Sequence, residues 1–85
     1  MRYTISKIKE EFKNIIGFKY DDYGHILTIC VLSSFSKVRE IKFRRTIPYT
    51  YEVAWQTTED DGFPLDYAKR VMEREGFETN LNYLY

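Results

Sequence analysis

Residues 25–32 read His-Ile-Leu-Thr-Ile-Cys-Val-Leu, and this octet decides the fold. Its apolar residues form two alternating sets, which point to opposite sides of an extended chain. The sets are Leu27, Ile29 and Val31 on one side, and Ile26, Cys30 and Leu32 on the other. A strand with two apolar faces is usually central in a sheet that is covered on both sides. The octet therefore predicts an interior strand, and other parts of the chain must cover each of its faces.

Upstream of the octet, residues 4–16 are predicted to form an amphipathic helix. Apolar side chains recur there at spacings of three and four, which is the period of one helix face. They are Ile5, Ile8, Phe12, Ile15 and Ile16. Thr4 or Ser6 supplies the N-cap, and Gly17 is expected to end the helix in the left-handed conformation.

Further strands are expected on both sides of the octet. Residues 18–20 form a short strand, and a turn at residues 21–24, with Asp first and Gly last, joins it to the octet. After a second turn at residues 33–36, residues 37–46 read as the next strand. Pro48 cannot donate a hydrogen bond to a sheet, so it marks a turn, a bulge or an edge.

Residues 49–56 show the clearest alternation in the chain. Tyr49, Tyr51, Val53 and Trp55 alternate with polar or small residues, which predicts a half-buried strand with these four side chains on one face. The shared parity of the rings and Val53 favours the core as the place of that face.

The C-terminal part predicts a second helix. Pro64 suits a first helical turn, and an apolar stripe follows it. The stripe is Leu65, Ala68, Val71 and Met72. Gly76 followed by Phe77 is typical of a Schellman ending, with Phe77 folding back onto Met72. The tail, residues 78–85, is apolar enough to add an edge strand or to lie across a sheet face.

Together these elements predict an α+β fold in one compact domain over residues 1–85. An antiparallel three- to four-stranded sheet is expected, with an N-terminal and a C-terminal helix, in the order α-β-β-β(-β)-α. The hydrophobic fraction of 44% and charged fraction of 31% are those of a globular chain, not of a disordered one. The formal net charge is zero, which excludes a histone-like polycation.

The cysteine count and the hydropathy of the sequence indicate the cellular compartment of the protein. The single cysteine, Cys30, cannot form an intramolecular disulfide, which favours the cytoplasm. No apolar run approaches the roughly 20 residues that span a bilayer, and residues 1–4 lead into a polar pattern unlike a signal peptide. We therefore expect a cytoplasmic protein with no membrane partner.

Enzyme signatures are close to absent. His25 and Cys30 have opposite parity in the predicted strand, so they cannot form a nucleophile and base pair. Two such residues are also too few for a structural zinc site. The acidic run Glu59, Asp60 and Asp61 lacks the alternating spacing of a calcium loop. We expect no catalytic residue, no metal and no cofactor, so the protein is not expected to be an enzyme.

Charge placement is the most informative feature of the sequence. Residues 1–48 hold ten Lys or Arg and five acids, whereas residues 49–85 hold three Lys or Arg and eight acids. Five of the cations fall within nine residues. They are Lys37, Arg39, Lys42, Arg44 and Arg45, and the aromatic row that begins at Tyr49 and Tyr51 follows them directly.

Two interpretations of this basic strand compete. Cations beside stacked rings are typical of a nucleic-acid platform, where phosphates contact cations and bases stack on rings. The other interpretation is structural: the rings form the core face of the strand, and the cations discourage aggregation at a sheet edge. The two oppositely charged halves of the chain are also able to pair in cis or across a dimer.

The order of elements resembles the double-stranded-RNA-binding domain, a helix followed by a three-stranded meander and a second helix. That family carries lysines at the start of its second helix. The matching residues here are Pro64-Leu65-Asp66-Tyr67-Ala68, with an acid and no lysine, so its function does not carry over. Size and element order are also similar to small virus-encoded inhibitors, anti-CRISPR proteins among them, by fold-level analogy alone.

The sequence thus favours a non-catalytic binding protein that acts on a protein partner, such as a host factor inhibited by a virus- or mobile-element-encoded protein. The expected contact residues are Lys37, Arg39, Lys42, Arg44, Arg45, Tyr49, Tyr51, Glu59, Asp60 and Asp61. The alternative is a nucleic-acid-binding module that uses strand 37–45 and the neighbouring rings. Self-association into a homodimer that covers leftover sheet surface is a third expectation.

Overall fold

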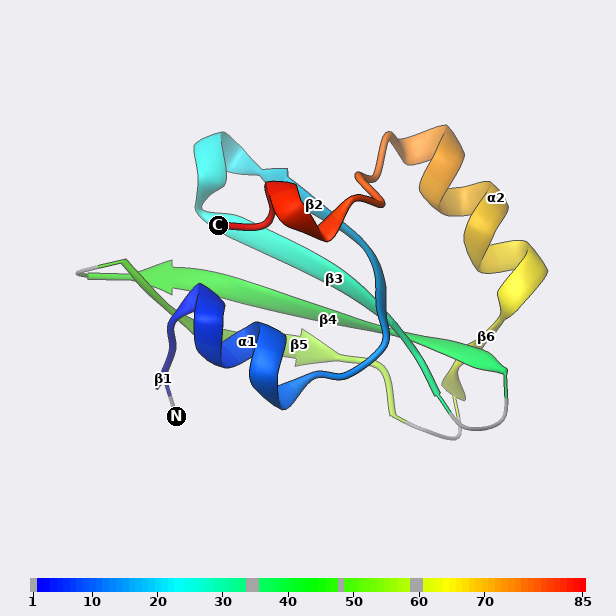
Figure 1. The fold of residues 1–85 in the computed structure, drawn as a ribbon, viewed down its shortest axis with the longest axis horizontal. Helices are drawn as coiled ribbons and strands as arrows, with labels where there is room; N and C mark the ends of the chain where they lie inside the picture. Colours follow the sequence, from blue (N-terminus) through cyan, green and yellow to red (C-terminus); the bar gives the residue numbers. More distant parts are fainter. Residues whose placement is uncertain (1, 34–35, 48, 59–60) are drawn as a thin grey trace.

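The computed structural model describes residues 2–33, 36–47, 49–58 and 61–85. Within these ranges the chain forms two α-helices, six strands and two short 3-10 helices (Figure 1). In chain order they are β1 (Arg2–Tyr3), α1 (Ile5–Glu11), β2 (Ile15–Asp21), η1 (Asp22–Gly24), β3 (Ile26–Leu32), β4 (Lys37–Thr46), β5 (Thr50–Gln56), β6 (Phe63–Pro64), α2 (Leu65–Glu75) and η3 (Leu81–Tyr83). The α+β class is confirmed.

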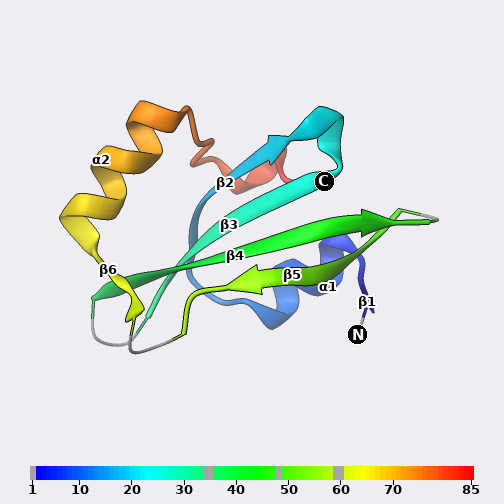
Figure 2. The ribbon, with the colours of Figure 1, turned by 180° about the vertical axis from the view of Figure 1, so that it is seen from behind.

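All strand pairs in the sheet are antiparallel, and the order across it is β1-β5-β4-β3-β2 (Figure 2). The short β6 pairs with the start of β4, beside Lys37 and Val38. The prediction of three to four strands was too low, because the expectation did not include the two-residue strands β1 and β6. The octet lies between β2 and β4, which confirms it as an interior strand.

Each face of β3 is covered by a different layer. On the first face, Leu27, Ile29 and Val31 pack in the main core against α1 and the C-terminal segment. Leu84 is fully buried there, so the tail does lie across a sheet face. On the second face, Cys30 packs in a smaller cluster under α2, with Val38, Ala68 and Met72. The predicted cover on both sides of the octet is confirmed.

Helix α1 is shorter than the sequence predicts. Its N-cap is Thr4, whose Oγ1 accepts a hydrogen bond from the Lys7 N–H at 3.2 Å. The helix ends at Glu11, and Asn14 turns the chain with a φ of +62°. Residues 15 and 16, predicted to be helical, belong to β2 instead. The helical spacing of these isoleucines was misleading because Ile15 pairs with Val31 in the sheet.

Gly17 does not end a helix, and that prediction was wrong. It lies in β2, paired with Cys30, under α2. A Cβ at this position would lie 2.7 Å from the Met72 Sδ, which is closer than real Cβ contacts. The glycine therefore lets α2 approach the second face of the sheet closely.

Strand β5 contains a bulge that the alternation of its sequence does not reveal. Lys42 pairs with Trp55, but the next residue, Phe43, pairs with Val53, so β5 has one extra residue at Ala54. Residues opposite each other across strands share a face. Trp55 is therefore on the second face with Lys42, whereas Val53 is on the first face with Phe43.

The predicted single aromatic face is wrong for this reason. Tyr51 is buried at 7% exposure in the main core, but Trp55 is 51% exposed and Tyr49 is 78% exposed. Tyr49 precedes β5, in the turn that joins it to β4. The row of rings that reads as one face in sequence is divided among the core, the second face and a turn.

The position and the ending of helix α2 agree with the prediction from the sequence. Pro64 lies directly before it, and Ala68 and Met72 are its buried residues. Gly76 has a φ of +76°, and the Phe77 N–H donates to the Met72 carbonyl at 2.8 Å, which confirms the predicted Schellman ending. Within the described ranges, no helix combines the length and the apolar character needed to cross a membrane.

Some predictions fall on residues outside the described ranges. They are the middle of the turn at residues 33–36, Pro48, Glu59 and Asp60.

Candidate functional site

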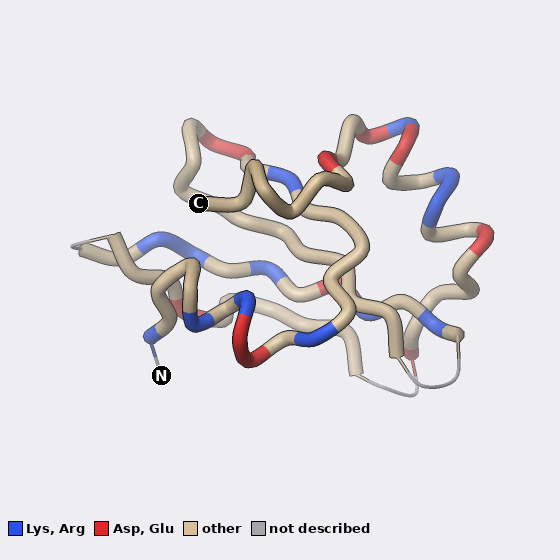
Figure 3. The backbone as a smooth tube through the Cα atoms, in the orientation of Figure 1, with Lys and Arg blue, Asp and Glu red and all other residues tan. Residues whose placement is uncertain are grey.

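The five cations of β4 do not form one patch, because successive residues of a strand point to opposite faces. Lys42 and Arg44 are on the second face. Lys37, Arg39 and Arg45 have the parity of the first face. Figure 3 shows the basic positions spread along the length of β4 rather than gathered at one point. A single flat partner cannot contact all five at once.

Three of these cations have partners within the sheet. Arg44 donates to the Glu52 carboxylate opposite it, and this hydrogen bond lowers the pKa of Glu52. The Lys42 Nζ lies 3.7 Å from the Glu40 Oε1. Arg39 donates to the Thr57 carbonyl and to the Gln56 side chain, both at 3.2 Å. The Arg44 and Arg39 hydrogen bonds join β4 to β5 and to the residue that follows it. The carboxylates of Glu52 and Glu40 lower the positive charge available to an external anion.

Arg45 is placed differently, at the tip of the β4–β5 hairpin. Its guanidinium lies 5.9 Å from the centre of the Tyr49 ring, within range of a cation–π contact. Beside it, Ile47 is 89% exposed and Tyr49 is 78% exposed. Tyr49 has a φ of +74°, a left-handed conformation that is costly for an aromatic residue. The tip therefore holds a large apolar surface in water on a strained backbone.

The β2–β3 turn lies at the same end of the sheet as this tip. The Arg45 N–H donates to the His25 carbonyl at 2.8 Å, which joins the two segments. Tyr23, in the turn, is 99% exposed and has a φ of +56°. Figure 1 shows both segments at the same end of the sheet, opposite α2. We call Tyr23, Arg45, Ile47 and Tyr49 the tyrosine end.

The other predicted contact residues lie elsewhere. Tyr51 is in the main core. Asp61 is exposed and accepts a hydrogen bond from the Thr58 hydroxyl at 2.8 Å, while Glu59 and Asp60 are outside the described residues. Tyr23 and Ile47 were not predicted. Their signals were a tyrosine inside an Asp-Asp-Tyr-Gly turn and an isoleucine directly before Pro48.

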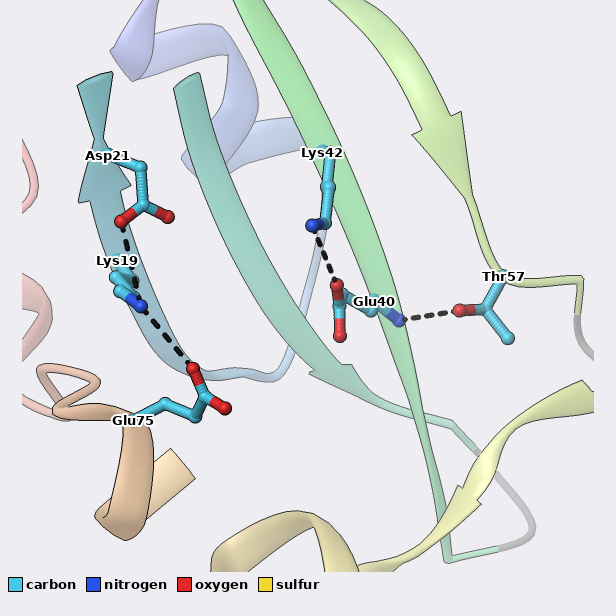
Figure 4. A network of polar contacts seen from close by, with 6 residues as sticks. All are labelled: Lys19, Asp21, Glu40, Lys42, Thr57 and Glu75. Atoms are coloured by element: carbon cyan, nitrogen blue, oxygen red, sulfur yellow. Dashed lines mark hydrogen bonds and ion pairs between the residues drawn. The ribbon is translucent and has the colours of Figure 1, made fainter. Parts of the chain in front are cut away.

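A second surface is built by cross-strand pairing on the second face. In one row across four strands, Lys19 pairs with Thr28, Thr28 with Lys42, and Lys42 with Trp55. Acidic side chains surround the lysines, as Figure 4 shows. Lys19 Nζ lies 3.5 Å from both Asp21 and Glu75. This surface carries charges of both signs beside a half-exposed ring.

Cys30 lies in the floor between α2 and the sheet. Burial, with a smaller contribution from the negative charge of Glu40, raises the pKa of its thiol to about 12. The thiol is therefore neutral near neutral pH and a poor nucleophile. Among the described residues, no group of three or more His, Cys, Asp or Glu side chains is placed to hold a metal ion.

No family model, curated protein or solved structure matches this chain.

Proposed function

We propose that the chain is a non-catalytic binding protein and that its tyrosine end docks on a protein partner. The observation that carries this proposal is the exposure of Ile47 and Tyr49 beside Arg45. Tyrosine and arginine are enriched among the residues that dominate the energy of protein interfaces. Isolated exposed apolar residues are common, but here three large exposed side chains from two turns share one end of the sheet with Arg45, at the end of β4.

The backbone supports the same proposal. Asp22, Tyr23 and Tyr49 all have positive φ values without being glycine. Such conformations cost of the order of 1 kcal/mol or more each and often occur at binding sites. A glycine at the position of Tyr49 would remove this cost but also the ring. The presence of tyrosine there favours a role for the ring itself.

Tyr49→Gly tests the proposal without endangering the fold, because glycine suits the positive φ. Combined with Ile47→Ser, we expect an affinity for the partner at least about 30-fold lower, since a hot-spot residue contributes about 2 kcal/mol or more. The measurement is affinity capture on immobilised protein, followed by titration of the captured partner.

Tyr67→Ala is the matched control, because Tyr67 is also exposed but lies on α2 at the opposite end. The partner must be lost with the tip variant and kept with the control, at unchanged melting temperatures. Equal capture by the native chain and the tip variant would remove the tyrosine end from the proposal.

The partner we propose is a host factor, inhibited by a protein that a virus or a mobile element encodes. This rests on the size and element order of the chain, by fold-level analogy. The genes next to its own provide the test. A phage or defence operon supports the inhibitor, and a housekeeping operon contradicts it.

A nucleic-acid-binding module is the second candidate, and one arrangement favours it. Trp55 is 51% exposed and directly opposite Lys42, with Arg44 on the same face. Bases stack on such a ring while phosphates contact the cations. Against it, Glu40 and Glu52 are paired with these two cations. We therefore rank it below protein binding.

The salt dependence of binding tests this second candidate. Engagement of about four phosphates predicts a slope of about −3 to −4 for log K against log salt concentration. Trp55→Ala should weaken binding to single strands, and Tyr83→Ala, an exposed ring on η3, is the control. The absence of salt-sensitive affinity for DNA and RNA, single- or double-stranded, would refute it.

A further inference from the structure

Two adjoining cavities lie between α2 and the second face of the sheet, away from the tyrosine end. One has a volume of about 110 Å³ and a mostly apolar lining that includes Cys30, Ala68 and Met72, with Glu40 and Arg74 as its charged residues. The other has a volume of about 260 Å³ and a charged lining. Glu40, Val71 and Phe77 line both cavities, so the two form one continuous groove.

The apolar cavity has the size of a side chain. Cavities of about 150 Å³ lined by aliphatic and aromatic groups take up benzene. A volume of about 110 Å³ therefore suits a branched aliphatic chain or a thioether. Burial keeps the Cys30 thiol neutral in this cavity. The apolar cavity thus selects an uncharged group of four or so heavy atoms.

The charged cavity offers both signs of charge at short range. Its side chains include two lysines, three carboxylates and the Thr28 hydroxyl, and Thr28 is only 3% exposed. Thr28 lies between Lys19 and Lys42 in the sheet register. The lysine-to-carboxylate distances here are 3.5 to 3.7 Å, longer than the 2.7–2.9 Å of a tight charge-assisted hydrogen bond. Figure 4 shows these loose pairs, which leave their polar atoms able to accept a further partner.

We propose that this groove binds a free α-amino acid with an apolar side chain. The side chain occupies the apolar cavity, and the ammonium group contacts Glu40 at the boundary between the cavities. The carboxylate, attached to the same carbon atom, contacts Lys42 and the Thr28 hydroxyl. Glu40 and Lys42 are paired with each other at 3.7 Å, so a ligand that inserts between them must replace both partners. A zwitterion does so with its ammonium and carboxylate groups, whereas a fatty acid or an alkylamine would separate the pair and leave one of the two side chains without a partner.

Titration with leucine, followed by two-dimensional amide NMR, tests the proposal. We expect a Kd of about 1 mM, typical of a ligand of this size, with shifts at Thr28, Cys30 and Val71. Leucinamide, which lacks the carboxylate, and N-acetylleucine, which lacks the ammonium, should each bind at least about tenfold more weakly. Equal binding of leucine and leucinamide, or no shift in the groove with leucine or methionine, would overturn the proposal.

One variant tests each of the two charged contacts, that of Glu40 with the ammonium group and that of Lys42 with the carboxylate. Glu40→Gln and Lys42→Met should each weaken leucine binding at least about tenfold, with the dispersion of the spectrum retained. Lys9→Met and Glu11→Gln, on exposed positions of α1, are the matched controls. Unchanged leucine affinity in the groove variants would contradict the assigned contacts. This test is independent of the tyrosine end, so either proposal can fail alone.

Discussion

Replacing Phe43 with alanine will lower the free energy of unfolding by about 4 kcal/mol, the largest loss we expect from one substitution. Phe43 is fully buried in the main core. Its ring packs edge to face with Tyr3 and Phe12, at centroid distances of 5.8 and 5.7 Å. The substitution therefore removes contacts to β1 and to the end of α1 together, and leaves a cavity in the main core.

Thermal unfolding followed by circular dichroism measures this effect. For a domain of this size, about 4 kcal/mol corresponds to a melting temperature roughly 15–30 °C lower. Phe63→Ala is the matched control, because Phe63 is 37% exposed in β6, beside the start of β4, and its substitution should lower the free energy of unfolding far less. If the two variants melt at the same temperature, Phe43 is not the centre of the core.

Raising the pH from 8 to 11 will lower the free energy of unfolding by about 3 kcal/mol through Cys30 alone. The pKa of this thiol is about 12 in the folded chain, against a value of 9.0 for a free thiol. Above pH 9 the unfolded state binds fewer protons than the folded state, so stability falls as pH rises. The stability that the buried, neutral Cys30 thiol contributes is fully present below pH 9 and is lost as the pH rises towards 12.

Urea unfolding at a series of pH values measures this loss. Tyr20 acts in the same direction, since burial and nearby tyrosines raise its pKa to about 12. Cys30→Ala removes only the thiol, so the variant should lose less stability than the native chain over the same range. An equally steep loss in the variant would show that Cys30 does not titrate as described.

The strands β3 and β4 could be predicted from sequence because their burial follows their own residue pattern. The apolar residues of β3 alternate to two covered faces, and Ile41 and Phe43 of β4 are both fully buried. Helix α2 was also predictable, since Pro64 and Gly76 mark its two ends. In each case a local signal and the tertiary environment agree.

The start of β2 was not predictable from local pattern. Ile15 and Ile16 continue the spacing of the helix that ends at Glu11, so periodicity alone assigns them to it. The pairing of Ile15 with Val31 and of Gly17 with Cys30 outweighs that spacing, and such long-range pairing is invisible in a local window.

The candidate site was predictable in composition but not in arrangement. The sequence indicates that β4 is basic and that rings follow it. Alternation divides the cations between two faces, and partners such as Glu52 neutralise some of them. Tyr49 was found among the predicted residues, whereas Ile47 was missed because an isoleucine is ordinarily assigned to a core.

The extra residue at Ala54 lets a strictly alternating sequence place its rings on both sides of the sheet. Without the bulge, Trp55 would share the parity of Val53 and lie on the first face, whereas the bulge puts it opposite Lys42 on the second. Deleting the Ala54 codon would bring the end of β5 into continuous register with β4 and leave Trp55 opposite Lys42. Loss of this codon is therefore an evolutionary step that conserves the chemistry of the second face.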